Sequence, residues 1–276
     1  MIKDVIVKLE QQARDPAQDF SISVAKTLGA HLAGVALAFV PEVLSRFPQL
    51  PRDMLAEIVT HSENAAQSAI DRFDAAARQS EVSREQRMLK ATEAEAPSVL
   101  ATFARRFDLS VLMQSEPNVV DNDDMIEASL LESGRPLVVV PYIQREGLQL
   151  DRVVCCWDGS RAATRAINDA LPLLVRAGTV ELLIVLNEKT SSDEQEIRGI
   201  EMAKHLARHD VKQLQIETTS AADIDVTGAI LSYVADRSAK LIVMGGYGHS
   251  RLREIILGGV TRDILKSMTV PIFMSH

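Results

Sequence analysis

Glycines gather in one short stretch near the C-terminal end of the sequence, LIVMGGYGHSRLREIILGGVT at residues 241–261. An apolar run typical of a strand buried on both faces begins this stretch, and a segment with helical spacing ends it. Glycine lets a ligand approach the backbone closely, and helix N-termini present N–H groups to anions. His249, Arg251 and Arg262 supply positive charge nearby. The stretch therefore predicts a phosphate cradle, in which the glycines are Gly245, Gly246, Gly248, Gly258 and Gly259.

The rest of the chain shows a repeating order of apolar strands and amphipathic helices. In the second half we expect strands at 153–156, 180–186, 214–218, 241–244 and 271–274, and helices at 162–175, 193–208 and 226–237. In the first half we expect strands at 5–7, 31–40, 86–90, 109–113 and 137–140, and helices at 17–28, 52–78, 96–106 and 125–131. Segments such as RPLVVVPY and TVPIFMSH correspond between the halves. The sequence therefore predicts two copies of one domain, at 1–147 and 148–276.

Strands that alternate with helices form right-handed βαβ units and parallel sheets. We expect an α/β protein with two tandem, doubly wound sheets, each with five mostly parallel strands. In such sheets ligands bind beyond the carboxyl ends of strands, where the winding reverses. The strands at 153–156 and 241–244 end at Asp158-Gly159 and Gly245-Gly246. If these strands are neighbours, both loops face one crevice.

Composition and charge exclude several classes of protein. The chain has 276 residues and a formal net charge of −8, whereas a nucleic-acid binder usually carries a basic face. No run approaches the roughly 20 apolar residues of a membrane span, and residues 1–10 have no signal-peptide pattern. The acidic excess lies mainly in residues 1–150, with 15 Lys and Arg against 22 Asp and Glu, while residues 151–276 have 15 against 16. The second half is therefore the half that repels phosphate less.

Several reactive side chains are better explained by packing or by solvent exposure. Cys155 and Cys156 lie in an apolar run, so we interpret them as buried thiols of a cytoplasmic protein. Trp157 is interpreted as a core residue and Arg262 as a surface residue. His205 and His209 have the i, i+4 spacing of a metal pair, but we expect a solvated face and no metal site. The buried face of that helix would then be formed by Ile197, Ile200, Ala203 and Ala207.

The motifs resemble those of the universal stress protein family, and the resemblance covers nearly the whole chain as a tandem, two-domain member with an adenine nucleotide alpha hydrolase-like fold. Nucleotide-binding members carry a glycine, two residues, a glycine, nine residues, and then glycine followed by Ser or Thr. Gly245, Gly248 and Gly258 have this spacing, but Gly259 replaces the hydroxyl residue. Asp158-Gly159-Ser160 matches the family's first strand end. The resemblance implies that Asp158 and the backbone of Val185 contact adenine.

We accordingly expect ATP or a related adenine nucleotide, with or without Mg²⁺, in the second domain. Gly245 and Gly248 would donate backbone N–H groups to the phosphates and ribose, and Gly258 and Gly259 would bind the terminal phosphates through the helix N-terminus. His249 and Arg251 would neutralise phosphate charge or lie in a solvated surface segment. The expected contact positions are Asp158, Val185, Gly245, Gly248, His249, Gly258, Gly259 and Val260.

The matching positions of the first domain differ in chemistry. Its corresponding loop is Gln114-Ser115-Glu116-Pro117-Asn118, and no glycine occurs between Gly34 and Gly134. Glu10 and Gln11 replace Asp158 and Gly159. The acidic residues Glu116, Asp121, Asp123 and Asp124 would repel phosphate. We therefore expect that the first domain has lost nucleotide binding and has a structural or partner-facing role.

Three functions remain open. The favoured one is a stress-related regulatory protein that binds nucleotide without efficient catalysis, with no catalytic residues assigned. The sequence has neither G-x-x-x-x-G-K-[ST] nor G-x-G-x-x-G, which disfavours an enzyme beyond a slow ATP hydrolase. A non-nucleotide-binding interaction or dimerisation module is the alternative that Gly259 supports. The resemblance also implies pairing through the last strands, 137–140 and 271–274, between chains in a homodimer or between domains of one chain.

Overall fold

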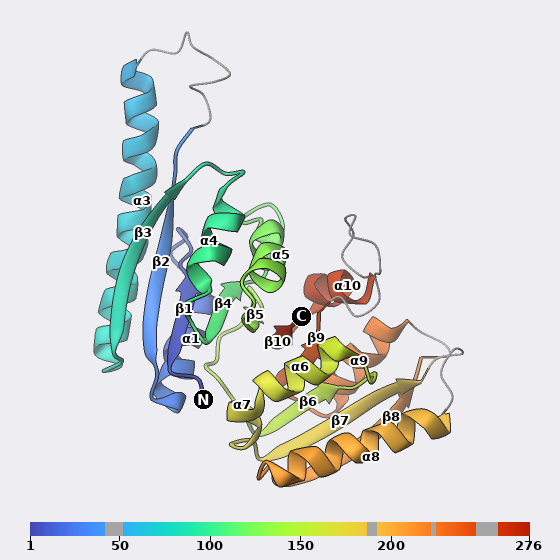
Figure 1. Cartoon of the computed structure of the whole chain (residues 1–276). Helices are drawn as coiled ribbons and strands as arrows, with labels where there is room; N and C mark the ends of the chain where they lie inside the picture. Colours follow the sequence, from blue (N-terminus) through green and yellow to red (C-terminus); the bar gives the residue numbers. More distant parts are fainter. Residues whose placement is uncertain (42–51, 187–191, 222–224, 247–258) are drawn as a thin grey trace. The chain divides into compact units, whose positions relative to one another are not determined.

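The computed structural model describes residues 1–41, 52–186, 192–221, 225–246 and 259–276 (Figure 1). The chain divides into two compact units, which we call the N-terminal unit, Ile2–Gly147, and the C-terminal unit, Leu148–His276. Each unit has five parallel strands in the described residues, with helices on both faces. The predicted fold class is therefore confirmed.

The N-terminal unit begins with a strand and alternates strands with helices. Its elements are β1 (Asp4–Lys8), α1 (Pro16–Leu28), β2 (His31–Phe39), α3 (Arg52–Gln79), β3 (Arg84–Ala91), α4 (Ala96–Ala104), β4 (Leu109–Met113), α5 (Asp123–Glu132) and β5 (Leu137–Val140). The strand order is β3-β2-β1-β4-β5, and the described strand pairs are parallel. Helices α1 and α3 contact each other, as do α4 and α5, which gives one helical layer on each face of the sheet.

Within the described residues, the C-terminal unit repeats this order with one additional short helix, α7. Its elements are β6 (Arg152–Cys156), α6 (Arg161–Asp169), α7 (Leu171–Leu174), β7 (Thr179–Leu186), α8 (Ser192–Arg208), β8 (Leu214–Ser220), α9 (Val226–Asp236), β9 (Leu241–Gly245), α10 (Gly259–Ser267) and β10 (Ile272–Ser275). The strand order is β10-β9-β6-β7-β8, again with parallel pairs. The two units thus share one topology.

One predicted helix, 162–175, is divided in the structure. Helix α6 ends at Asp169, and α7 begins at Leu171 after a cap at Ala170. Pro172 explains the break, because proline has no backbone N–H and its ring clashes with the carbonyl four residues earlier. The prediction of one continuous helix was therefore wrong.

The core of each unit lies along its most apolar strands. Every residue of β4 and β5 is buried, as is all of β9 except its last residue. Strands β3 and β8, each at one edge of its sheet, differ, since they consist mostly of partly buried and exposed positions and carry several polar side chains. Strands covered by helices on both faces read as continuous apolar runs, whereas charged edge strands discourage pairing with other chains.

One carboxylate lies fully buried within the sheet of the C-terminal unit. Glu181 of β7 has no exposed surface and forms an ion pair with Arg152 at the start of β6. Its second oxygen accepts a hydrogen bond of 3.0 Å from the Tyr233 hydroxyl on α9. A buried charge is tolerated only when it is paired and hydrogen-bonded. This network therefore joins β6 and β7 to α9. It lies near the amino ends of these strands, away from the carboxyl ends of β6 and β9 at Cys156 and Gly245.

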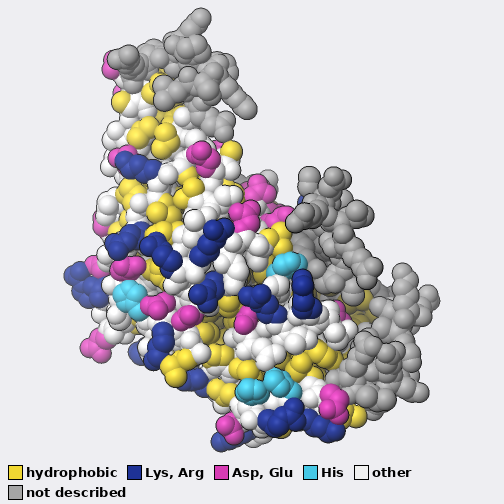
Figure 2. Space-filling model, viewed as in Figure 1, with side chains coloured by type: hydrophobic (Ala, Val, Ile, Leu, Met, Phe, Trp, Pro, Cys, Tyr) yellow, Lys and Arg dark blue, Asp and Glu magenta, His cyan; other side chains and the backbone are white. Residues whose placement is uncertain are grey.

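The surface carries charges of both signs. Figure 2 shows basic and acidic side chains interspersed over the described part of the face that it draws. Exposed pairs such as Lys90–Glu63 and Lys204–Glu201 contribute little to stability, because water screens them. Among the described helices, none has the length and apolar character needed to span a membrane.

Candidate functional site

The carboxyl ends of β6 and β9 lie side by side in the C-terminal unit. The two strands pair in parallel, with Val153 opposite Leu241 and Cys155 opposite Val243. Strand β7 lies on the other side of β6, so the winding reverses between β6 and β9. The strands at 153–156 and 241–244 are therefore neighbours, as the predicted site requires. The loops after these strands lie at the switch point, where doubly wound sheets bind ligands.

Asp158 sits in a tight turn directly above β6. Its Oδ1 accepts a hydrogen bond of 2.9 Å from the Ser160 backbone N–H, and Gly159 between them has a positive φ of 74°. Ser160 in turn caps α6, because its Oγ accepts a 3.1 Å hydrogen bond from the Ala163 N–H. The Asp158 residue is exposed. The turn thus holds a carboxylate at the carboxyl end of β6.

Val185 places a backbone acceptor beside this turn. The Trp157 N–H donates to the Leu183 carbonyl over 2.8 Å, which is the last bond between β6 and β7. Carbonyls two residues apart in a strand point to the same side. The Val185 carbonyl is therefore directed toward the end of β6, one step beyond the paired region. This direction suits the backbone contact that the resemblance implies.

Gly245 is a glycine for a reason that does not involve a ligand. A Cβ at this position would lie 2.5 Å from the Ala163 nitrogen and 2.6 Å from the Ala162 carbonyl carbon. The end of β9 therefore packs directly on the first turn of α6. The next N–H, that of Gly246, donates to the Ser275 carbonyl over 2.9 Å and belongs to the sheet. Close packing thus accounts for this part of the glycine motif.

The N-terminus of α10 supplies the anion-binding side of the candidate site. Gly259 begins the helix and is exposed, and the nearest atom to a Cβ there would be Asp263 Oδ2 at 3.9 Å. Val260 is also exposed, whereas Thr261 is buried. The first backbone N–H groups of a helix have no partner within the helix and can bind an anion. Arg262 is exposed, as expected.

Part of the predicted site lies outside the described residues. Gly248, His249, Arg251 and Gly258 fall within 247–258, which the structure does not describe. The contacts predicted for them stay predictions. The described positions place two acceptors, the Asp158 carboxylate and the Val185 carbonyl, at the same edge of the sheet as a helix N-terminus. Such a site can accept from an amine at one end and donate to an anion at the other.

The thiols beside this site are not activated. Cys155 is buried, and burial raises the pKa of its thiol well above the ordinary range. Burial, followed by the negative charge of Asp158, raises the pKa of Cys156 to about 12. Both side chains are therefore neutral thiols at neutral pH rather than nucleophilic thiolates. Trp157 is buried, in agreement with the predicted core role.

The buried face of α8 differs from the prediction. Met202 and Leu206 are buried, whereas Ile200 is 40% exposed and Ala207 is exposed, so the expected apolar stripe was wrong. Ile197 lies among the residues whose side chains the structure does not describe. His205 is half-buried beside Met202, with its Nε2 2.9 Å from Asn168 Oδ1. Burial, then the neighbouring His209, lowers its pKa.

These histidines gather no further metal ligand within the described part of the chain. There, no group of three or more His, Cys, Asp or Glu side chains has the arrangement of a metal site.

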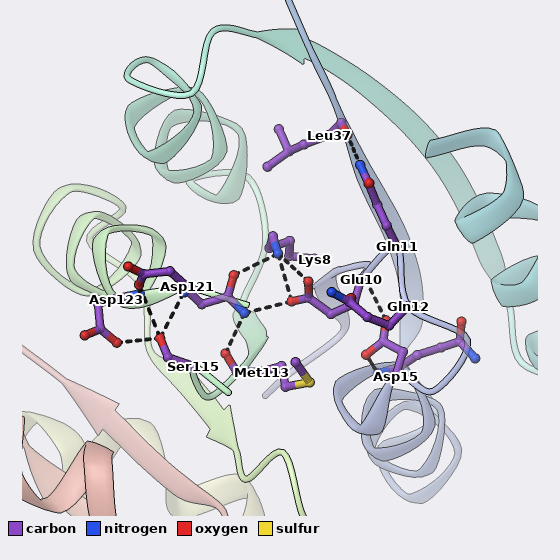
Figure 3. Close-up of polar contacts among 12 residues, drawn as sticks. Lys8, Glu10, Gln11, Gln12, Asp15, Leu37, Met113, Ser115, Asp121 and Asp123 are labelled. Carbon is purple, nitrogen blue, oxygen red and sulfur yellow. Dashed lines mark hydrogen bonds and ion pairs between the residues drawn. The ribbon is translucent and has the colours of Figure 1, made fainter. Parts of the chain in front are cut away.

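The corresponding crevice of the N-terminal unit contains a buried ion pair (Figure 3). Lys8 Nζ, at the end of β1, lies 2.8 Å from both carboxylate oxygens of Glu10. Asn122, just before α5, accepts from Lys8 Nζ through Oδ1 and donates to Glu10 Oε1 through Nδ2, each over 2.8 Å. Sequence reasoning identified Glu10 but missed Lys8 and Asn122. A lysine at the end of an apolar strand was the available signal.

The surrounding residues hold this ion pair in place. The Glu10 N–H donates to Asp15 Oδ2 over 2.8 Å, and Arg72 donates to the carbonyls of Glu10 and Gln12 over 3.0 and 2.9 Å. A cavity of about 170 Å³ remains beside the pair. Ligand pockets usually measure about 300–1,000 Å³. The described cavity is therefore smaller than this usual range.

Comparisons of the sequence with known proteins point to one family. The model of the universal stress protein family matches residues 149–276. Universal stress protein Slr1230 of Synechocystis is 27% identical over 138 residues, which are 50% of this chain and 46% of that protein. Universal stress protein MJ0577 of Methanocaldococcus jannaschii is 30% identical over 95 residues, which are 32% of this chain and 59% of that protein. The chain thus spans about half the length of these curated relatives.

Solved structures resemble the fold over the whole chain. A universal stress protein from Archaeoglobus fulgidus aligns with 99% of this chain and 97% of its own, with a TM-score of 0.75 and 13% identity. The functionally unknown protein PA1789 from Pseudomonas aeruginosa aligns with 99% and 92%, with a TM-score of 0.62 and 14% identity. At such identities the likeness concerns the fold alone. The match to residues 149–276 shows that the C-terminal unit belongs to the universal stress protein family.

Proposed function

We propose that this protein is a stress-related regulatory protein that binds ATP or a related adenine nucleotide in its C-terminal unit. Membership of the C-terminal unit in the universal stress protein family supports the stress-related role. The observation that carries nucleotide binding is the pairing of β6 with β9, since it brings Asp158 to the edge of the sheet at which α10 begins.

The proposed chemistry divides between the two sides of the crevice. The adenine amino group donates to the Asp158 carboxylate and the Val185 carbonyl, while the phosphates accept from N–H groups at the start of α10. The helix dipole adds about half a positive charge at that end. Mg²⁺, where it accompanies the nucleotide, is held mainly by phosphate oxygens and water.

We further propose that turnover is slow at most. Efficient phosphoryl transfer requires preorganised positive charge and a positioned nucleophile. The sequence has no Walker lysine, and Cys155 and Cys156 are neutral thiols. Binding without efficient catalysis fits a regulatory protein. We place that protein in the cytoplasm, in keeping with its free cysteines. Pairing through 137–140 and 271–274 stays a prediction.

The second candidate is an interaction module that binds no nucleotide. Two observations favour it, because Gly245 is explained by packing on Ala163 and because Gly259 lacks the family's hydroxyl. Titration calorimetry with ATP decides between the candidates. One site per chain supports nucleotide binding, whereas the absence of binding at millimolar ATP leaves the interaction module.

The variant Asp158→Ala tests the site itself. It removes the proposed acceptor and should weaken ATP binding by at least about 1.4 kcal/mol, which is tenfold in affinity. Asp225→Ala is the matched control, because Asp225 also accepts a backbone hydrogen bond at a helix start, from Gly228 over 2.6 Å. Circular dichroism should show both variants folded. Equal ATP affinity in the two variants would contradict the assignment of Asp158.

A further inference from the structure

We propose that the crevice of the N-terminal unit is a small-anion site that the chain's own Glu10 carboxylate occupies. The site is formed by two buried donors, Lys8 Nζ and Asn122 Nδ2, which both reach the same carboxylate (Figure 3). Glu10 therefore acts as a tethered ligand. A free carboxylate of similar size should take its place when the Glu10 side chain is removed.

The donors are matched to this one anion. The side chains of Lys8 and Glu10 are only 8% and 4% exposed. Lys8 Nζ has three N–H bonds, and its partners are the two Glu10 oxygens and Asn122 Oδ1. The two N–H bonds of the Asn122 amide reach Glu10 Oε1 over 2.8 Å and the Met113 carbonyl over 3.0 Å. Without Glu10, two of the three Lys8 N–H bonds and one of the two Asn122 N–H bonds would be buried and unpaired, at high cost.

The side chain of Asn122 binds the Glu10 carboxylate and does not cap helix α5. An asparagine directly before a helix usually accepts from the first N–H groups of that helix. Asn122 precedes α5 but makes no such side-chain hydrogen bond. Instead, Asp121 Oδ1 accepts from the Asp123 N–H over 3.1 Å, and Ser115 Oγ accepts from the Asn122 N–H over 2.9 Å. The amide is therefore directed into the crevice, at the positive end of α5.

The position and size of the crevice also fit a ligand site. Strands β1 and β4 pair in parallel, with Val5 opposite Leu109, so this is the switch point of the sheet. The cavity of about 170 Å³ beside the ion pair is lined by Lys8, Glu10 and Asn122. Without the Glu10 side chain this space grows and can admit acetate. The Glu10 backbone stays fixed by Asp15 and Arg72.

The test is chemical rescue of Glu10→Ala by acetate, measured by thermal unfolding of the full chain. Calorimetry follows both units, and fluorescence of Trp157, the single tryptophan, reports the C-terminal unit. We expect Glu10→Ala to lower the midpoint of the N-terminal unit by roughly 10 °C. Sodium acetate should restore several degrees, whereas sodium chloride at the same ionic strength should not. The double variant Lys8→Met/Glu10→Ala, which lacks the ammonium, should not respond to acetate.

Two results would overturn the proposal: an unchanged midpoint in Glu10→Ala, or an equal response to acetate in the double variant. If Glu10→Ala does not fold without an anion, refolding in acetate but not in chloride supports the proposal. If it folds in neither, Glu10→Gln decides, because it keeps the volume and removes the charge. A parental midpoint in Glu10→Gln contradicts the proposal, and a lowered midpoint supports it. ATP affinity should be unchanged in every folded variant.

Discussion

At the scale of single residues, two glycines of the candidate site in the C-terminal unit, Gly245 and Gly259, have opposite surroundings. Gly245 has no room for a side chain, because a Cβ there would meet the Ala163 nitrogen at 2.5 Å. Gly259 is open, with no atom closer than 3.9 Å to such a Cβ, and its φ is not in the left-handed region. Packing therefore requires the first glycine, whereas nothing in the described structure requires the second. A residue with a hydroxyl group can therefore be introduced at position 259 without a steric clash.

We expect Gly259→Ser to strengthen ATP binding. The new hydroxyl lies at the start of α10, where it can donate to a phosphate, and a hydrogen bond to a charged group contributes about 1.5–3 kcal/mol. The affinity should rise by roughly tenfold or more in titration calorimetry. Gly259→Ala is the control, since it adds the Cβ without the donor. Equal affinities in the two variants would argue against a phosphate at this position.

Asp15 is a buried carboxyl group whose surroundings raise its pKa. It caps α1 by accepting from the Gln18 N–H over 3.0 Å, and it also accepts from the Glu10 N–H. Burial raises its pKa from 3.8 to about 6, against the lowering effect of the Glu10 hydrogen bond. Because the folded-state pKa lies above the unfolded value, protonation of Asp15 favours folding. This contribution is complete below pH 3.8 and is lost as the pH rises through about 6.

The prediction is a specific change in pH dependence in Asp15→Asn. The shift of about two units corresponds to about 3 kcal/mol of unfolding free energy between the two pH limits. Other carboxylates titrate in the same window, so the parent and Asp15→Asn are compared by urea unfolding between pH 4 and pH 7. The advantage of the parent over the variant should shrink as the pH rises. A constant difference would show that Asp15 has an ordinary pKa.

At the scale of elements, the Glu181 network determines how α9 is joined to the sheet. Glu181 is fully buried, and its partners Arg152 and Tyr233 come from β6 and α9. Burial, and then the hydrogen bond to Glu181, raises the pKa of Tyr233 well above its ordinary range. The phenol therefore stays a hydrogen-bond donor at any physiological pH. Removing the arginine would leave a carboxylate in the core without its main countercharge.

We expect Arg152→Met to lower the unfolding free energy by about 3–5 kcal/mol, because it leaves the buried Glu181 carboxylate with only the more distant Arg237, 4.0 Å away, as a countercharge. Tyr233→Phe should cost less, about 1–3 kcal/mol, since it removes one hydrogen bond to a charged group. Lys204→Met is the control, because its pair with Glu201 is exposed and should matter by less than about 1 kcal/mol. Urea unfolding followed by Trp157 fluorescence measures all three. Similar losses for Arg152→Met and Lys204→Met would contradict the role of the network.

The elements also show what a sequence can and cannot predict. Strands such as β9 and β5 are continuous apolar runs, and their positions follow from composition alone. Helix α8 has two apolar stripes in its sequence. Packing against the sheet determines that Met202 and Leu206 are buried and that Ile200 is exposed. The Lys8–Asn122 contact joins residues 114 positions apart. No local pattern predicts such a contact, because it depends on which strands become neighbours.

At the scale of the whole molecule, the two units share a topology but differ in what their switch points hold. In the N-terminal unit, Glu10 and Lys8 neutralise each other inside the crevice. In the C-terminal unit, Asp158 is exposed, and Cys156 takes the place of Lys8 at the end of the strand. The repeat in the sequence predicted the shared fold, whereas the absence of glycines between Gly34 and Gly134 predicts that only the second half binds nucleotide, which stays a prediction. ATP should therefore raise the stability of the C-terminal unit only.

The last prediction is that ATP protects only the C-terminal unit from hydrogen exchange. A ligand that binds one folded unit stabilises it by RT ln(1 + [L]/Kd), which is about 2.7 kcal/mol at a hundredfold excess over Kd. Peptides from 148–276 that exchange by unfolding of their unit should then slow by roughly 100-fold, while peptides from 2–147 keep their rates. Asp158→Ala at the same ATP concentration is the control and should lose the protection. Equal slowing in both units would mean that they unfold together or that the N-terminal crevice binds nucleotide too. Titration calorimetry separates these two cases, because the second requires two sites per chain.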